Sequence, residues 1–130
     1  MPQPQPKNPF RVLYIEDNAL VREITCELLA IDDREVVAVA TGEEALSAFE
    51  NGPFDIVVTD ISLPAMSGFD LVRHLKKLAP EVPIILASGY PLHLDQAQLS
   101  SNIRAITKPF DSPQLEALIA ELCGGEAAAN

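Results

Sequence analysis

The stretch DIVVTDISLPAMSGFDL, residues 55–71, contains an apolar run, a central acidic residue and the start of a helical pattern. The apolar residues of Ile56–Thr59 do not alternate with polar ones, which is typical of a strand covered by helices on both faces. From about Ser67 to Leu78 the apolar residues recur at helical spacing. The stretch therefore predicts a buried strand that ends at Asp60 and leads into a helix.

The same succession of strand and helix recurs on either side of this stretch. A first strand leads through an acidic loop into a helix with Val21, Ile24 and Leu28 on one face. Five such units result, too few for a closed eight-unit barrel, so the sequence predicts an α/β domain with a doubly wound parallel sheet. The other predicted elements are strands Arg11–Ile15, Val36–Ala40, Ile84–Ala87 and Ala105–Thr107, and helices Gly42–Asn51, a weaker one after Pro91, and Pro113–Leu122.

Composition and charge exclude several classes of function. The 130 residues are 48% hydrophobic and 22% charged, which describes an ordinary single globular domain. The net charge of −10 repels nucleic acid, and the basic group Arg73, Lys76 and Lys77 fits the solvated face of a helix. The sequence has neither a signal-peptide pattern nor an apolar run long enough to span a membrane, so we expect a cytoplasmic protein.

The two ends of the chain differ in composition from the middle. Residues 1–9 hold four prolines and are expected to form a flexible leader. The domain is expected over residues 10–123, followed by a disordered tail at 124–130. Cys26 and Cys123 are each set among apolar helical residues, which favours buried thiols without chemistry of their own.

Acidic and polar residues gather where the predicted strands end. The acids are Glu16, Asp17 and Asp60, and Ser88 and Lys108 follow the last two strands. Because doubly wound sheets place their sites at the carboxyl ends of strands, we expect all five to share one crevice. Three carboxylates about 4 Å apart repel one another by roughly 4 kcal/mol per pair at an effective dielectric near 20.

A cation must offset that repulsion. Lys108 supplies one positive charge, and ligands that are all oxygens favour magnesium over zinc. His74 and His93 lie away from this edge and are expected on the surface. A carboxylate beside a magnesium ion, with a lysine and a hydroxyl opposite, suits phosphoryl transfer, with the central Asp60 as nucleophile.

Four motifs carry a resemblance to a known family: IEDN at 15–18, DIVVTDISLPAMSGFDL at 55–71, ILASGY at 85–90 and TKPF at 107–110. In this order and spacing they resemble the response-regulator receiver domain of two-component signalling, of the type found in the bacterial chemotaxis regulator. The likeness covers about Phe10–Cys123. It implies a flavodoxin-like sheet with strand order 2-1-3-4-5 and five helices.

The resemblance also implies a role for each matching residue. Asp60 would accept the phosphoryl group, Ser88 would bond to a phosphoryl oxygen, and Lys108 would pair with the group. Pro64 and Gly68 match the turn into the third helix, and the bond between Lys108 and Pro109 is expected to be cis. The implied magnesium ligands are Asp17 directly, Glu16 through water, Asp60, and Ser62 through its backbone carbonyl.

One position departs from the family pattern. Three residues before Lys108 the family usually has an aromatic ring that moves inward on activation, and this chain has Ala105. Two hypotheses remain for Tyr90, which follows Ser88 by two positions. It either replaces the missing switch together with Ser88, or it only lines the crevice.

The resemblance implies a protein partner as the source of phosphate. A histidine kinase or a histidine phosphotransfer protein would donate the phosphoryl group to Asp60. Leu20 and Ile24, at the start of the first helix, are expected to form its docking surface, because Leu20 lies on the flank of the apolar face beside the site. The downstream partner is unknown, and we expect a stand-alone regulator or a receiver module of a hybrid histidine kinase.

Three other functions fit the sequence less well. An aspartate-nucleophile phosphatase needs a second acid two residues after Asp60, where this chain has Ser62. An inert receiver-like interaction module would have lost site residues that are present here. A flavin-binding protein would need a hydroxyl-rich loop after the first strand, and EDNAL is acidic. We therefore expect a phosphoacceptor signalling domain, not an enzyme, whose only chemistry is its own phosphorylation and dephosphorylation.

Overall fold

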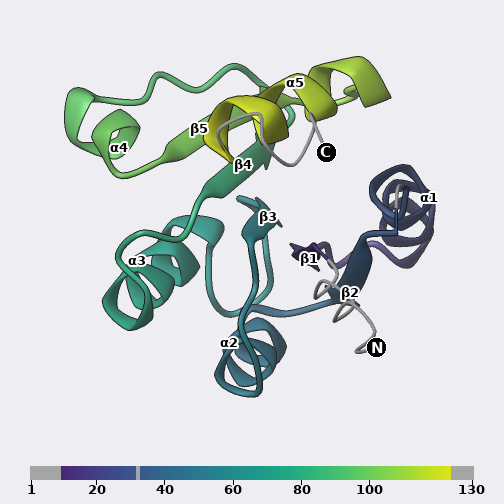
Figure 1. Ribbon diagram of the computed structural model, residues 1–130, viewed down its shortest axis with the longest axis horizontal. Coiled ribbons are helices and arrows are strands. Elements are labelled where there is room, and N and C mark those ends of the chain that lie inside the picture. Colours follow the sequence, from purple (N-terminus) through teal and green to yellow (C-terminus); the bar gives the residue numbers. More distant parts are fainter. Residues whose placement is uncertain (1–9, 32, 124–130) are drawn as a thin grey trace, which may run out of the picture.

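The structure, a computed structural model, describes residues 10–31 and 33–123. Strands and helices alternate through all of this part of the chain (Figure 1). The predicted leader at 1–9 and the predicted tail at 124–130 lie outside the described residues. The elements are β1 (Arg11–Ile15), α1 (Ala19–Leu29), β2 (Glu35–Val39), α2 (Gly42–Glu50), β3 (Ile56–Asp60), α3 (Gly68–Leu78), β4 (Ile84–Ser88), α4 (Gln96–Ser100), β5 (Ile103–Thr107) and α5 (Ser112–Leu122).

The five strands form one parallel sheet in the order β2-β1-β3-β4-β5, which confirms the predicted fold. In the register, Ile15 pairs with Thr59 of β3, and Asp60 pairs with Ala87 of β4. Most element boundaries agree with the sequence within one residue. The exception is β5, which begins two residues before its predicted start because Arg104 interrupts the apolar run and hides its strand character.

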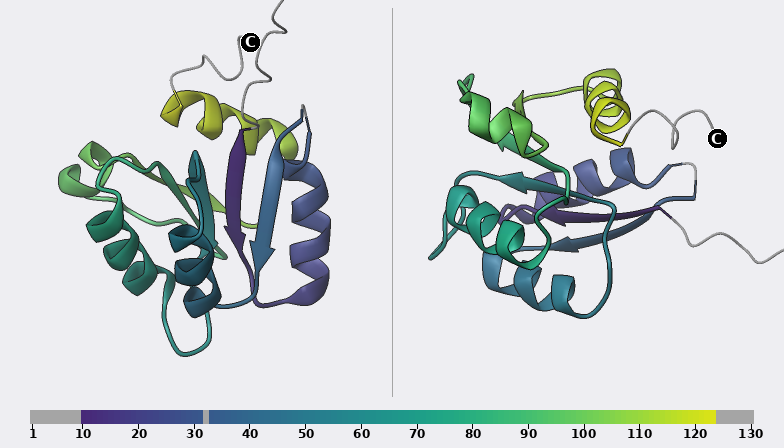
Figure 2. Two further views of the ribbon diagram at one scale, coloured as in Figure 1. Left: turned by 60° about the horizontal axis from the view of Figure 1, so that its bottom comes forward. Right: turned by 60° about the vertical axis from the view of Figure 1, so that its left-hand side comes forward.

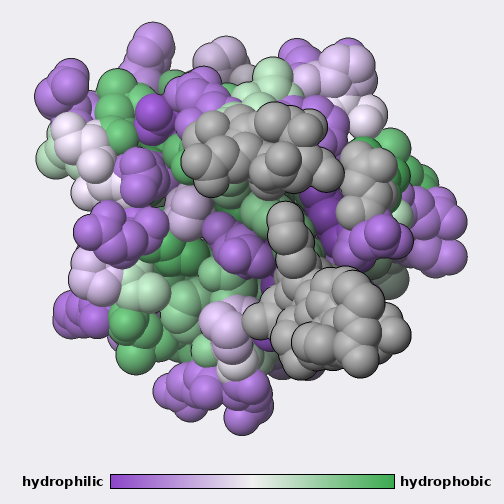
Figure 3. Space-filling view, in the orientation of Figure 1, coloured by the Kyte–Doolittle hydropathy of each residue, from purple (hydrophilic) through white to green (hydrophobic). Residues whose placement is uncertain are grey.

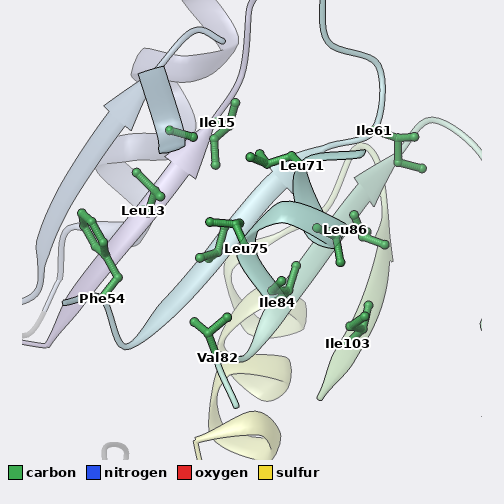
Figure 4. Close-up of a cluster of buried hydrophobic side chains, with 13 residues drawn as sticks. Leu13, Ile15, Phe54, Ile61, Leu71, Leu75, Val82, Ile84, Leu86 and Ile103 are labelled. Atoms are coloured by element: carbon green, nitrogen blue, oxygen red, sulfur yellow. The ribbon is translucent and has the colours of Figure 1, made fainter. Parts of the chain in front are cut away.

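Helices cover both faces of the sheet, α1 and α5 on one and α2, α3 and α4 on the other (Figures 1 and 2). Successive residues of a strand point to opposite faces, so Leu13 and Ile15 pack toward α2 and α3 while Val12 and Tyr14 pack toward α1 and α5. Figure 4 shows the apolar cluster on the α2 and α3 side of the sheet, with Leu13, Leu75 and Ile84 among its members. Two apolar layers thus hold the strand ends in fixed positions.

The contact face of α1 differs from the predicted one. Val21 and Ile24 are 37% and 52% exposed, and the residues that this helix buries are Thr25 and Leu29. The apolar spacing correctly predicted a helix. The residues that pack on the sheet, however, each follow a predicted apolar residue by one position, Thr25 after Ile24 and Leu29 after Leu28. The predicted apolar stripe remains on the surface, beside Pro109 and Phe110.

Other local predictions have mixed outcomes. His74 and His93 are exposed, as predicted. Cys26 and Cys123 are free thiols, as predicted, but they are half-buried and not buried. Burial still raises the pKa of Cys123 to about 11, which keeps that thiol protonated at neutral pH. None of the helices in the described ranges combines the length and the apolar character needed to cross a bilayer.

Candidate functional site

Three acids meet at the carboxyl ends of β1 and β3. Carboxylate oxygens of Glu16, Asp17 and Asp60 all lie within 4.8 Å of one another. Glu16 and Asp60 are only 2% and 8% exposed, whereas the Asp17 side chain is open to solvent. The structure thus brings together the three acids that the sequence placed at this edge.

Lys108 connects two of these acids. Its Nζ donates hydrogen bonds to Glu16 Oε1 at 2.9 Å and to Asp60 Oδ2 at 2.7 Å. The backbone of Lys108 is tied to β4, because Lys108 N donates to the Ser88 carbonyl at 2.7 Å. The Lys108–Pro109 bond is cis, as expected. One ammonium group therefore faces the charge of two buried carboxylates.

The charge balance of the crevice is visible in the pKa of Lys108. Burial lowers this pKa, but hydrogen bonds and charge attraction from Asp60 and Glu16 outweigh burial, so the net shift is upward. Lys108 is therefore firmly protonated at neutral pH. Because it carries one charge against three nearby carboxylates, the site retains an excess of negative charge that favours a further cation.

Glu16 is held more tightly than the sequence suggested. Its Oε2 accepts a hydrogen bond from Asn18 N at 3.1 Å, and its backbone carbonyl accepts one from Arg22 Nη1 at 2.8 Å. Asn18 also caps α1 by accepting from Val21 N. Sequence reasoning missed both residues; the N-cap preference for Asn before a helix was an available signal for Asn18, whereas Arg22 had none.

The backbone of Asp60 is fixed by close packing against the start of α3. Gly68 N donates to the Ile61 carbonyl at 2.7 Å, and a Cβ on Gly68 would lie 2.4 Å from the Asp60 carbonyl oxygen. Only glycine fits this approach. The Asp60 side chain is oriented by Ser62 N, which donates to Oδ1 at 3.2 Å. The turn around Gly68 therefore places Asp60 at the centre of the crevice.

Ser88 and Tyr90 follow on β4 and the loop after it. The Ser88 side chain is 3% exposed, and its Oγ accepts a hydrogen bond from Tyr90 N at 3.1 Å. The hydroxyl proton of Ser88 is thus left for another acceptor. Tyr90 is 65% exposed, and Ala105 of β5 pairs with Leu86 of β4.

An apolar groove lies beside the acids, between α1 and the segment after β5. Its volume is about 430 Å³, and its walls include Val21, Ile24 and Leu28 on one side and Pro109 and Phe110 on the other. Lys108 also lines it. The predicted docking residues Leu20 and Ile24 are 67% and 52% exposed on this helix.

The fold and this crevice agree with the family to which the chain belongs. Residues 12–120 match the model of the response regulator receiver domain. The chain is therefore a receiver domain of two-component signalling.

Curated relatives include proteins of several architectures. The chain is 34% identical over 115 residues to the sensor kinase CckA of Brucella abortus, covering 85% of this chain and 12% of the kinase. It is 34% identical over 83 residues to a protein-glutamate methylesterase/protein-glutamine glutaminase of Rhodospirillum centenum, covering 62% of this chain and 21% of that protein. Each relative is several times longer than the matched part.

Solved structures of receiver domains are similar to this chain over most of its length. A receiver domain protein (CheY-like) from Methanospirillum hungatei has 28% identity and a TM-score of 0.80, covering 95% of this chain and all of that one. The receiver domain of the hybrid histidine kinase CckA has 28% identity and a TM-score of 0.72, covering 87% of this chain and 98% of its own. The phosphatase alternative is not favoured by any of these matches.

Proposed function

We propose that this receiver takes a phosphoryl group onto Asp60 from a histidine kinase or a histidine phosphotransfer protein. The observation that carries the proposal is the convergence of three carboxylates within 4.8 Å, bridged by Lys108 and flanked by the buried Ser88 hydroxyl. No separate enzymatic activity is required of the chain. We place the protein in the cytoplasm, where such donors act on it.

The residues of the crevice divide the chemistry among them. An Asp60 carboxylate oxygen attacks the phosphorus; an O–P bond forms as the bond from phosphorus to the donor atom breaks, and the donor keeps the electron pair. The Lys108 ammonium, now bonded to Asp60 Oδ2, offsets the added negative charge. The Ser88 hydroxyl donates a hydrogen bond to a phosphoryl oxygen while it still accepts one from Tyr90 N.

The donor atoms fit a magnesium ion. Every candidate ligand is an oxygen, and the exposed Asp17 carboxylate lies beside Asp60. Both Glu16 oxygens already accept hydrogen bonds, from Lys108 and Asn18 N, which supports a role for Glu16 through water, and the Ser62 carbonyl completes the proposed set. When bound, the ion would supply the positive charge that lowers repulsion between these acids and phosphoryl oxygens.

Acetyl phosphate tests the phosphoacceptor directly. With magnesium, intact-mass spectra of the parent should show one added phosphate, and Asp60→Asn or excess EDTA should remove it. The matched control is Asp33→Asn, the same chemical change at an exposed position away from the crevice. Added phosphate on Asp60→Asn, or undiminished labelling in EDTA, would contradict the proposal.

The exposed stripe of α1 supports a docking surface for the phosphodonor. Leu20 and Ile24 project from the helix that borders the apolar groove, and Lys108 joins that groove to Asp60. A donor seated there brings its phosphohistidine toward Asp60. Leu20→Glu should slow transfer from the cognate kinase and leave acetyl phosphate labelling intact. Equal loss with both donors would mean that the site itself was damaged.

Tyr90 remains our candidate for the conformational readout, together with Ser88. The hydrogen bond from Tyr90 N to Ser88 Oγ links the loop to the residue that meets the phosphoryl group, and Ala105 has no ring to move. Tyr90→Ala keeps this backbone donor and removes only the ring, so it tests whether the ring carries the readout. We expect it to change the NMR shifts that beryllofluoride induces in α4 and to shorten the acyl phosphate lifetime. Identical shifts and lifetimes in parent and variant would exclude this role.

A further inference from the structure

A second groove, of about 390 Å³, lies between α3 and α4, away from the three acids. It exists because α4 is only five residues long and buries none of them, so α4 does not close over the sheet beside α3. The floor is apolar and includes Leu86 of β4 and Ile103 of β5. Phe69 and Val72 continue this apolar surface up the α3 wall.

The α3 wall of this groove is basic. It carries Arg73, Lys76 and Lys77, three of the nine basic residues of a chain whose net charge is −10. The sequence suggested that these residues form a solvated helix face, but Lys76 turns inward and donates to the carbonyls of Pro80, Val82 and Ser101. Its ammonium is therefore fixed beside the groove.

The side chains of the other two cations, Arg73 and Lys77, face solvent. Arg73 pairs with Asp70, and both side chains of this pair are largely exposed. Lys77 is exposed and forms no ion pair with any residue that the structure describes. On the opposite wall, the carboxylate of Asp95 is bonded to Gln98 N as the cap of α4. The groove therefore combines an apolar floor with one positive rim.

We infer that the α3–α4 groove is a docking site for an acidic segment of a partner protein, one that places an apolar side chain on the floor and carboxylates on the Arg73–Lys77 rim. Charge complementarity selects this occupant, since the basic rim is a local exception on an acidic surface. The inference goes beyond phosphoryl transfer and does not require Asp60. Nucleic acid is disfavoured by the net charge of the whole chain.

The probe is a random peptide library displayed on phage and selected against the full chain. Enriched sequences should combine Asp or Glu with Leu, Ile or Phe. A synthetic, fluorescein-labelled copy of the best sequence is then titrated by anisotropy, and its binding should weaken as salt rises from about 50 to about 300 mM. Amide NMR shifts of the bound chain should map to α3, α4 and β5.

Two matched pairs of variants locate the site. On α3, Lys77→Gln and His74→Glu each make the helix more negative by one charge, and of these two residues only Lys77 lines the groove. On α4, Ala97→Glu and Gln96→Glu each add one negative charge, and of these two only Ala97 lines the groove. We expect Lys77→Gln to weaken binding about threefold and Ala97→Glu about tenfold, with less than about twofold for either control.

Several results would overturn the inference. They are a library that yields no acidic sequence, variants and controls that weaken binding equally, and shifts that map to α1. Competition by inorganic phosphate beyond that of sodium chloride at equal ionic strength would make the rim a free-anion site instead. Self-association of the parent that Ala97→Glu abolishes would identify the occupant as a second copy of the chain. Asp60→Asn should bind the peptide like the parent, which separates this result from the phosphoacceptor test.

Discussion

Helices α3 and α4 border the same groove but are held to the sheet in different ways. Helix α3 has eleven residues, and it buries Leu71, Val72 and Leu75 in the apolar cluster of Figure 4. Helix α4 has five residues, and none of them is buried. Burial of a leucine side chain stabilises a fold by roughly 1.5–3 kcal/mol. Burial of apolar side chains is thus the main contribution that holds α3 on the sheet. Helix α4 lacks this contribution.

Polar bonds hold α4 instead. Asp95 and Gln98 form a capping box at its start. At its end, Lys76 donates to the Ser101 carbonyl, and Arg104 Nη1 donates to the Leu99 carbonyl at 3.1 Å. Such bonds contribute only about 1 kcal/mol each and break without loss of the core. Helix α4 can therefore change position while the sheet and α3 stay folded.

The surface in Figure 3 agrees with this contrast. Around the position of α3 a hydrophobic patch reaches the surface among hydrophilic residues, and Leu78 at the end of α3 is 52% exposed. The exposed Leu78 does not loosen α3, because Leu71, Val72 and Leu75 in the preceding turns are buried and hold the helix on the sheet. Helix α4 has no buried turn of this kind.

The largest effect is expected from Leu75→Ala. This residue is fully buried on the sheet side of α3, and its loss leaves a cavity, so we expect the free energy of unfolding to fall by about 2–5 kcal/mol. Urea unfolding followed by circular dichroism measures the change. Leu99→Ala on the exposed side of α4 is the control and should cost less than about 0.5 kcal/mol. Equal losses would show that α4 depends on apolar contacts as α3 does.

The second prediction concerns how the two helices begin. A Cβ at residue 68 would lie 2.4 Å from the Asp60 carbonyl oxygen and 2.8 Å from Ile61 Cα, so Gly68→Ala must shift the backbone, at a cost of about 1–3 kcal/mol. Because the shift involves Asp60, acetyl phosphate labelling should also slow. Asp95→Ala removes the cap of α4 and should cost about 1 kcal/mol without slowing the labelling. Unchanged labelling in Gly68→Ala would break the link between α3 and the site.

Lys76→Met tests the polar bonds of α4 directly. Methionine keeps the unbranched apolar chain but leaves the Pro80, Val82 and Ser101 carbonyls without the ammonium donor. We expect the free energy of unfolding to fall by about 1 kcal/mol. Amide hydrogen exchange should become faster only in residues 95–102. Lys77→Met, on an exposed neighbour, should change neither. Faster exchange throughout the sheet would show that Lys76 supports the whole fold.

The sequence predicted the parts of the molecule that depend on strand ends. Parallel strands align their carboxyl ends at one edge, so the convergence of Glu16, Asp17 and Asp60 followed from the strand assignment alone. The inward turn of Lys76 could not be predicted, because its partners are backbone carbonyls, which every residue carries. The buried face of α1 was also missed. Apolar spacing identifies a stripe but not whether the sheet or a partner covers it, and here the sheet contacts Thr25 and Leu29.

The smallest expected effect is a difference in pH dependence between two lysines. Burial lowers the pKa of Lys76 from its ordinary value of 10.5, and Glu81 opposes this shift only in part. For Lys108 the net shift is upward, because Asp60 and Glu16 outweigh burial. The two lysines therefore contribute to stability with opposite signs as the pH rises.

For Lys76 the sign follows from proton binding. The folded chain holds this proton less tightly than the unfolded chain, so unfolding takes up a proton between the lowered pKa and 10.5, and the Lys76 contribution to the free energy of unfolding rises with pH. Lys76→Met removes that contribution. The difference in free energy of unfolding between parent and Lys76→Met should therefore widen as the pH rises from about 8 toward 10.5, measured by urea unfolding at each pH. For Lys77→Met the difference in free energy of unfolding from the parent should not change with pH. If the difference for Lys76→Met narrows as the pH rises, the three carbonyl partners of Lys76 favour its ammonium form more strongly than burial disfavours it.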